Sequence, residues 1–255
     1  MAPVELLEVQ PGERVLDLCA APGGKSTQIA AKLQRQGFLL CNEIHPARAK
    51  ILSENVERMG IRNALVVNET PQKLAGIFPG YFHRIMVDAP CSGEGMFRKD
   101  EVAVSEWSTD NVEICWQRQR RILADIWPAL KSGGLLIYST CTYNTQENEE
   151  NVRWIADELG ADILPLTIQE EWGITGNLLP DAHFPVYRFL PHKAQGEGLF
   201  LAVLRKHGES AESVRFSSKE RKGKGKPSQP LFSKEQLAEA SRWIFADGYE
   251  LQPLG

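Results

Sequence analysis

The segment from residue 14 to Glu43 constrains the fold of this chain more than any other part of the sequence. Residues 14–18 form a short apolar run that leads directly into a glycine turn at 20–25. A helical pattern follows over 26–36, and a second apolar run over 38–44 carries Glu43 near its end. This order predicts two parallel strands joined by a helical crossover.

The same alternation continues along the chain. It predicts further helices over 46–59, 112–130 and 146–159, and further strands over 64–67, 84–87, 135–139, 162–166 and 199–204. Glycines at 133–134 are expected to stop the second of these helices. The strands are continuously apolar, which is typical of a parallel sheet covered on both faces. We therefore predict an α/β fold with a mostly parallel, twisted sheet, and a long loop over 169–198 beside it.

Composition narrows the class of protein. The 255 residues are enough to bury a full core. Five widely spaced cysteines, with no Cys-x-x-Cys among them, indicate reduced thiols and argue against a structural zinc site. The sequence has neither the pattern of a signal peptide nor an apolar run long enough to cross a bilayer. We expect a soluble cytoplasmic protein with no metal and no membrane partner.

The glycine turn and Glu43 predict a site for an adenosine-containing ligand. Glycines let a ligand approach the backbone, and Glu43 can accept hydrogen bonds from ribose hydroxyls. Residues 24–26, Gly-Lys-Ser, imitate the end of a P-loop, but Cys19 stands where that loop needs its first glycine. The spacing of a dinucleotide site is also absent. S-adenosylmethionine (SAM), which needs ribose acceptance and no phosphate nest, fits best.

Two cysteines are expected beside this ligand. The apolar run 85–87 ends in Asp88, and because Pro90 cannot continue a central strand, Cys91 is presented on a loop. Cys141 follows the strand over 135–139 in the same way. If these two strands are neighbours in the sheet, both thiols share one pocket at the carboxyl ends of the strands.

Two thiols facing a methyl donor suggest chemistry on carbon 5 of a pyrimidine. A thiolate that adds to carbon 6 makes carbon 5 nucleophilic enough to take a methyl group, and the thiolate must then leave. Asp88 could assist by hydrogen bonding to the ring nitrogen. The target base must lie outside its stack. This chemistry requires one attacking thiol but leaves open whether it is Cys91 or Cys141.

Three separated motifs carry a family resemblance. They are Cys-Ala-Ala-Pro-Gly-Gly-Lys at 19–25, Asp-Ala-Pro-Cys-Ser-Gly-Glu-Gly at 88–95, and Ser-Thr-Cys-Thr at 139–142 with Glu-Asn-Glu at 147–149. Over about residues 9–205, the chain resembles the RNA 5-methylcytosine methyltransferases of the NOL1/NOP2/Sun family. Residues 94–99 and 196–200 are most similar to the bacterial ribosomal RNA branch, the RsmF-like group.

The resemblance implies a Rossmann-like, class I SAM-dependent methyltransferase with a late antiparallel strand, acting on RNA as a monomer. By position, Cys141 matches the nucleophile, Cys91 the thiol that helps release the product, and Asp88 a further catalytic residue. The expected function is methylation of cytosine carbon 5, in ribosomal RNA, through a covalent cysteine adduct. The implied cofactor-binding residues are Cys19, Ala20, Ala21, Pro22, Gly23, Gly24, Lys25, Glu43, Asn68 and Asp88.

The resemblance also implies a domain organisation. Residues 1–207 would form the catalytic domain, 208–230 a basic linker, and 231–255 the start of a C-terminal RNA-binding region. The lysines of the linker would serve either solubility or RNA contact. Because the family carries an upstream RNA-binding region and this chain has few residues before its first strand, we expect a fragment of a longer protein.

Other functions remain open at this stage. The chain could methylate cytosine in transfer RNA, or it could be a non-catalytic RNA-binding module on a methyltransferase fold. A zinc cytidine deaminase is disfavoured because Glu94 stands where its second cysteine ligand should be. Phe97, Tyr138 and Tyr143 could either stack on a base or pack in the core. Arg98 and Lys99 could face RNA phosphate or solvent.

Overall fold

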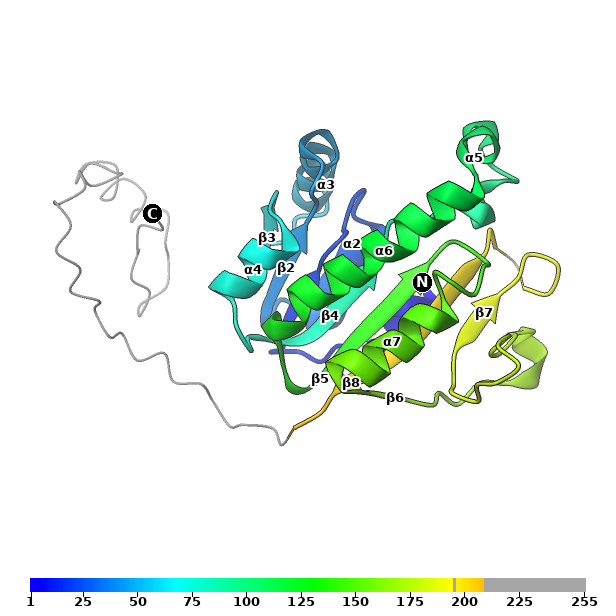
Figure 1. Ribbon diagram of the computed structural model, residues 1–255. Coiled ribbons are helices and arrows are strands. Elements are labelled where there is room, and N and C mark those ends of the chain that lie inside the picture. The colour runs from blue at the N-terminus through cyan, green and yellow to red at the C-terminus, as the bar shows by residue number, and fades with distance from the viewer. Residues whose placement is uncertain (195, 209–255) are drawn as a thin grey trace, which may run out of the picture. The chain divides into compact units, whose positions relative to one another are not determined.

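A computed structural model describes residues 1–194 and 196–208, which form one eight-stranded sheet with helices on both faces (Figure 1). The strands are β1 (Arg14–Asp17), β2 (Phe38–Asn42), β3 (Ala64–Val67), β4 (Phe82–Asp88), β5 (Leu130–Thr140), β6 (Ala161–Ile163), β7 (Tyr187–Phe189) and β8 (Leu199–Lys206). The helices are α1 (Ala2–Leu6), α2 (Gly24–Leu33), α3 (Pro46–Arg58), α4 (Pro71–Ile77), α5 (Glu101–Glu106), α6 (Thr109–Ile126) and α7 (Glu149–Leu159). Three short 3₁₀ turns are η1 (Glu94–Met96), η2 (Trp127–Ala129) and η3 (Glu170–Trp172).

The strand order is β3-β2-β1-β4-β5-β8-β6, with β7 paired to β8 outside this path. The first five strands in this order are parallel, and β8 runs antiparallel to β5, β6 and β7. The expected mostly parallel sheet with a late antiparallel strand is therefore confirmed. Because parallel strands end at the same edge, the loops that follow β1 to β5 meet there.

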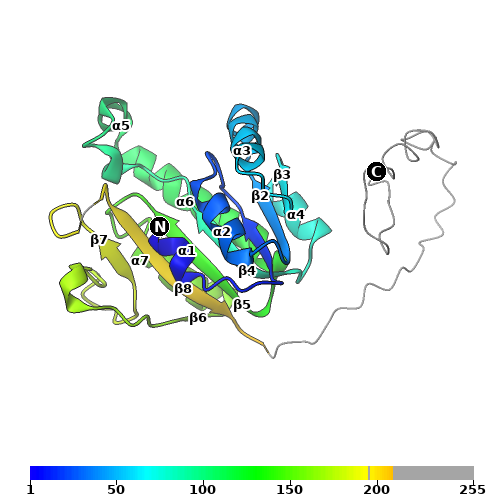
Figure 2. The same cartoon turned by 180° about the vertical axis from the view of Figure 1, so that it is seen from behind.

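Alternate strand residues face two hydrophobic cores. Val15 of β1 faces the core under α1, α2 and α3, whereas its neighbour Leu16 faces the core under α4, α6 and α7. The two views show these helix layers on opposite sides of the sheet (Figures 1 and 2). Burial on both faces explains why the strands are continuously apolar in the sequence.

Several predicted boundaries differ from the structure. The helix expected over 112–130 ends at Ile126, because Pro128 cannot donate the next helical hydrogen bond. The glycines at 133–134 do not stop this helix; they lie inside β5, where Gly133 has a φ of +73° and the register against β4 shifts. The strand expected over 162–166 is the shorter edge strand β6.

Three helices, α1, α4 and α5, and one strand, β7, were not predicted from the sequence. Within the expected loop over 169–198, β7 pairs with β8 and Thr175 forms a bridge to Arg188. The expected linker and C-terminal region lie, apart from Gly208, outside the described residues. Of the helices that the structure describes, none is long and apolar enough to cross a membrane.

Candidate active site

The glycine turn between β1 and α2 is held in place by α3. Asn55 Nδ2 donates to the carbonyl of Pro22 at 2.7 Å, and Arg48 Nη2 donates to the carbonyl of Ala21 at 3.1 Å. Gly23 has a φ of +116°, and a Cβ there would lie 3.2 Å from a side-chain carbon of Leu52. The turn therefore needs glycine at Gly23 to pack against α3.

Glu43 provides the expected acceptor beside this turn. Its side chain is only 3% exposed, and Oε1 accepts a hydrogen bond from the backbone N–H of His45 at 3.0 Å. Oε2 lies 3.4 Å from Arg48 Nη1 but accepts no hydrogen bond from the described residues. A buried carboxylate oxygen that lacks a donor suits a ribose hydroxyl, so the residues present fit SAM.

The end of β3 reaches the same edge through Asn68, whose Nδ2 donates to the carbonyl of Glu43 at 2.5 Å. Asn42, which the sequence analysis did not single out, links three strand ends. Its Nδ2 donates to the carbonyl of Leu18 at 3.1 Å, and its Oδ1 accepts from the backbone N–H of Glu69 at 3.0 Å. Asn42 is buried, so these contacts are shielded from water.

Asp17 lies buried below the glycine turn. Burial raises its pKa from 3.8 to about 6, although Ser26 Oγ donates a hydrogen bond to Oδ2 at 2.6 Å. Oδ1 has no partner among the described residues. Because the folded state binds the Asp17 proton more tightly than the unfolded state, this group lowers stability as the pH rises from about 4 to 6.

We expect Asp17→Asn to become more stable relative to the wild type as the pH rises. The difference in unfolding free energy should grow by about 2 kcal/mol between pH 4 and pH 7, which is most of the cost of ionising Asp17 in the folded state. Urea unfolding at several pH values measures this difference. The exposed Asp157→Asn serves as the control, and a difference for Asp17→Asn that does not change with pH would contradict the assignment.

Asp88 accepts hydrogen bonds from one residue of β5 and one residue of α2. It pairs in register with Ser139 of β5, whose Oγ donates to Oδ1 at 2.7 Å. Lys25 Nζ of α2 donates to Oδ2 at 2.7 Å. The strands that end at Asp88 and Ser139 are therefore neighbours, as expected, and Asp88 joins the glycine turn to the loop of Cys141.

The structure brings the two predicted thiols together. Cys91 Sγ and Cys141 Sγ lie 3.2 Å apart on the loops that follow β4 and β5. The hydrogen bond from Cys91 lowers the pKa of Cys141, whereas the same contact, together with burial, raises the pKa of Cys91. Of the two thiols, Cys141 is therefore the one that ionises more readily.

Comparison with known proteins identifies the family. The sequence model described as 16S rRNA methyltransferase RsmB/F matches residues 4–205. The chain belongs to this family. It is 39% identical over 194 residues to the ribosomal RNA small subunit methyltransferase F of Cronobacter sakazakii, a match that covers 76% of this chain and 40% of that protein. The chain thus spans about 40% of the length of the curated relatives it matches first.

Solved structures agree with this family. NSun6 from Pyrococcus horikoshii with SFG has a TM-score of 0.70 and 30% identity, covering 81% of this chain and 51% of that one. A methyltransferase homologue from Pyrococcus horikoshii has a TM-score of 0.69 and 28% identity, covering 80% and 65%. The expected class I SAM-dependent methyltransferase fold and the SAM cofactor class are confirmed.

In this RsmB/F-family chain, Glu94 and Gly95, which follow Cys91, contact the loop that carries Cys141. Gly95 N donates to the carbonyl of Cys141 at 2.7 Å, and a Cβ at Gly95 would lie only 2.5 Å from that oxygen. Glu94 Oε2 accepts from the backbone N–H groups of Tyr143 and Asn144 at 2.7 and 3.0 Å. The segment after Cys91 therefore holds the loop after Cys141 through backbone contacts.

A buried ion pair also contacts the loop that follows Cys141. The guanidinium of Arg188 pairs with Glu149, and the two side chains are 1% and 0% exposed. Arg188 Nη1 also donates to the carbonyl of Tyr143 at 2.6 Å. The sequence offered no periodic signal at Arg188, which lies within the region expected to be a loop.

The side chains considered for base stacking differ in their surroundings. Tyr138 is fully buried and donates its hydroxyl to the carbonyl of Glu147 at 2.6 Å, so of the two alternatives left open by the sequence it packs in the core. Phe97 packs edge to face against Trp107, with ring centroids 6.3 Å apart, and both stay partly exposed. Tyr143 donates its hydroxyl to the carbonyl of Glu197 at 2.8 Å.

The remaining cysteines do not join the thiol pair. Burial raises the pKa of Cys19 strongly, and it raises the pKa of Cys41 to about 12. Cys115 lies in α6, where burial also raises its pKa. These directions agree with the expectation that the three cysteines carry no side-chain chemistry.

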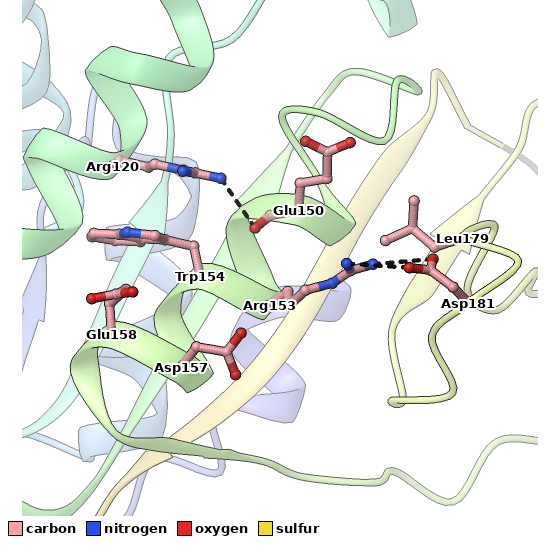
Figure 3. A pocket seen from close by; sticks show the side chains of 8 residues that line it. All are labelled: Arg120, Glu150, Arg153, Trp154, Asp157, Glu158, Leu179 and Asp181. Atoms are coloured by element: carbon pink, nitrogen blue, oxygen red, sulfur yellow. Dashed lines mark hydrogen bonds and ion pairs between the residues drawn. The ribbon is translucent and has the colours of Figure 1, made fainter.

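A cavity of about 350 Å³ lies on the outer side of α7, away from the sheet (Figure 3). It is lined by Arg120, Glu150, Arg153, Trp154, Asp157, Glu158, Leu179 and Asp181. None of the predicted site residues lines it. Its four carboxylates outnumber its two arginines, which makes it a poor site for phosphate.

Proposed function

We propose that this chain carries the catalytic domain of a SAM-dependent RNA methyltransferase that modifies carbon 5 of cytosine in ribosomal RNA. The observation that carries the proposal is the Cys91–Cys141 contact beside Asp88, at the same edge of the sheet as the glycine turn. Membership of the RsmB/F family and the name of its relatives support ribosomal RNA as the substrate.

The cofactor would be held at the ends of the first three strands. Residues 19–25 would approach it through their backbone, Glu43 would accept ribose hydroxyls, and Asn68 would lie near the adenine. When bound, SAM supplies a methyl group that is open to attack by a carbon nucleophile. The chain's own groups must make carbon 5 of the base into that nucleophile.

Cys141 would start the reaction as a thiolate. Its sulfur bonds to carbon 6, and the electrons of the carbon 5–carbon 6 double bond spread into the ring, so that carbon 5 can take the methyl group. Asp88, held by Lys25 and Ser139, would accept a hydrogen bond from the ring nitrogen as that nitrogen gains a proton. Transfer of the carbon 5 proton to solvent water then restores the double bond, and the carbon–sulfur electron pair leaves with the Cys141 sulfur as a thiolate.

Cys91 would act in this last step. Its thiol carries a proton and lies within hydrogen-bond distance of the Cys141 sulfur. A hydrogen bond to the departing sulfur stabilises the thiolate and so favours cleavage of the carbon–sulfur bond. The proposal thus gives attack to Cys141 and release to Cys91, the roles that the family resemblance implies.

We expect Asp88→Asn to lower the methylation rate by about a hundredfold, the scale for loss of one preorganised electrostatic contact. Asparagine keeps the shape but removes the charge that pairs with Lys25. Single-turnover transfer of labelled methyl groups to RNA measures the rate, with Asp157→Asn on the outer side of α7 as the matched control. A rate within twofold of the wild type would contradict a catalytic role for Asp88.

Bisulfite sequencing of ribosomal and transfer RNA, from strains with and without the gene, tests the substrate. Loss of a 5-methylcytosine in small-subunit ribosomal RNA would support the proposal. Loss confined to transfer RNA would favour the alternative substrate. Unchanged RNA in both pools would favour a non-catalytic RNA-binding module.

A further inference from the structure

Glu147 is a fully buried carboxylate that receives hydrogen bonds from three separate parts of the chain. Asn144 Nδ2 donates to Oε1 at 2.8 Å, Gln119 Nε2 of α6 donates to Oε2 at 2.6 Å, and Ser92 N donates to Oε2 at 3.1 Å. Every one of these partners is a donor. The carboxylate form of Glu147 therefore matches its surroundings, and a neutral amide would not.

This hydrogen-bond network includes the backbone groups on both sides of Cys91. Ser92, whose N–H binds Glu147, directly follows Cys91, and Pro90 directly precedes it. The carbonyl of Pro90 accepts from Gln119 Nε2 at 3.0 Å, and this amide also binds Glu147. The position of Cys91 thus depends on a side-chain network centred on Glu147.

The same carboxylate reaches the loop of Cys141. Asn144 lies in that loop, and its Nδ2 also donates to Thr142 Oγ1 at 3.0 Å. Thr142 Oγ1 in turn lies 2.9 Å from Ser92 Oγ, across the two loops. Since β4 ends at Asp88 and β5 at Thr140, no sheet hydrogen bond joins the two thiol-bearing segments. Glu147 and these hydroxyl groups connect them next to the thiols, in addition to the contacts of Glu94 and Gly95 with the loop of Cys141.

The charge of Glu147 acts on the thiols as well. The pKa of Cys91 is raised first by its hydrogen bond to Cys141, then by burial, and further by the charges of Cys141 and Glu147. The charge of Glu147 also raises the pKa of Cys141, but by less than the hydrogen bond from Cys91 lowers it. The other titratable groups whose charges act on the pair are Asp88 of β4, Lys25 of α2, Tyr138 of β5 and Tyr143 after β5. A buried carboxylate beside Cys91 makes a second negative charge there costly.

We propose that Glu147 is the positioning residue of the thiol pair: it joins the two cysteine loops and maintains the contact between their sulfur atoms. Its contacts predict that the pair separates, and that the two thiols become alike, when the carboxylate is lost. The consequence for RNA methylation rests on the proposed function, but the state of the thiols in the free protein does not.

The test is alkylation of the full chain by iodoacetamide, without RNA, followed by mass spectrometry of each cysteine at pH 6–10. In the wild type, Cys141 should react first. In Glu147→Gln, the donors on Ser92 and Gln119 face an amide, the sulfur contact weakens, and the pKa of Cys141 rises toward its ordinary value. We expect alkylation of Cys141 at pH 7 to slow about tenfold, as one pKa unit implies, and that of Cys91 to speed up.

Two further variants make the result decisive. Glu150→Gln changes a carboxylate that lines the outer cavity of Figure 3, and it should leave both alkylation profiles unchanged. Asn144→Ala removes the tether to the Cys141 loop but keeps the charge of Glu147, and it should slow alkylation of Cys141 while speeding that of Cys91 less than Glu147→Gln does. Thermal unfolding identifies the variants that are folded.

A folded Glu147→Gln with wild-type profiles at both cysteines would overturn the proposal. If that variant does not fold, wild-type profiles in Asn144→Ala overturn it instead. Failure of the wild type to methylate RNA would contradict the proposed function, whereas the alkylation results for Glu147 would stand on their own.

Discussion

Cys91→Ala is expected to accumulate a covalent protein–RNA adduct in the presence of SAM, and Cys141→Ala is expected to form none. Cys141 makes the bond to carbon 6, so its loss should lower methylation by about 10⁴-fold or more. Cys91 lies 3.2 Å from the attacking sulfur and helps it leave, so its loss should slow release rather than attack. Denaturing gels with labelled RNA measure the adduct.

The matched control for this experiment is Cys115→Ala. This cysteine is buried in α6 and has no role in the proposed reaction, so the variant should form and release product as the wild type does. An adduct trapped in Cys141→Ala would reverse the two roles. Equal, rapid turnover in both active-site variants would exclude covalent catalysis by either thiol.

Arg188→Ala is expected to lower the free energy of unfolding by about 3–5 kcal/mol. The substitution leaves the carboxylate of Glu149 buried without its cation, and it leaves the carbonyl of Tyr143 without its donor. Guanidinium unfolding monitored by tryptophan fluorescence measures the loss. We also expect lower methylation by the folded fraction, because Tyr143 lies two residues after Cys141.

The double variant Arg188→Met/Glu149→Leu separates charge from packing. It removes both charges and keeps much of the buried volume, so it should be more stable than Arg188→Ala. Arg153→Ala is the control, because Arg153 pairs with Asp181 at the surface, where loss of an ion pair costs about 0–1 kcal/mol. A loss below about 1 kcal/mol for Arg188→Ala would show that the buried pair contributes little.

Much of the fold follows from local patterns in the sequence. The strand, glycine turn and helix around Gly23 depend on residues close together in the chain, so the sequence predicts them. The placement of Asp88 and Cys141 at one edge follows from the rule that parallel strands end together. The short helix α4 also had a usable signal, because Thr70 caps it and Pro71 begins it.

Other features depend on contacts between residues far apart in the chain. Arg188 pairs with Glu149 although 39 residues separate them, and Gln119 meets Glu147 across 28 residues. Neither contact has a periodic signature, because each involves a single polar side chain on an irregular segment or on a buried helix face. The sequence left the role of Tyr138 open for the same reason: only packing decides whether an aromatic at a strand end faces the core or a ligand.

The residues of the sequence alone establish the alternating α/β fold, the glycine turn with its acidic neighbour, and two thiols on loops that follow predicted strands. They do not establish that these strands are neighbours, which the pairing of β4 with β5 shows. Nor do they establish which thiol ionises more readily. That depends on a sulfur–sulfur distance of 3.2 Å and on the burial of Glu147, which brings Ser92, Gln119 and Asn144 to one carboxylate. Proton affinity depends on burial, charge and hydrogen bonding in three dimensions, so only the tertiary structure decides it.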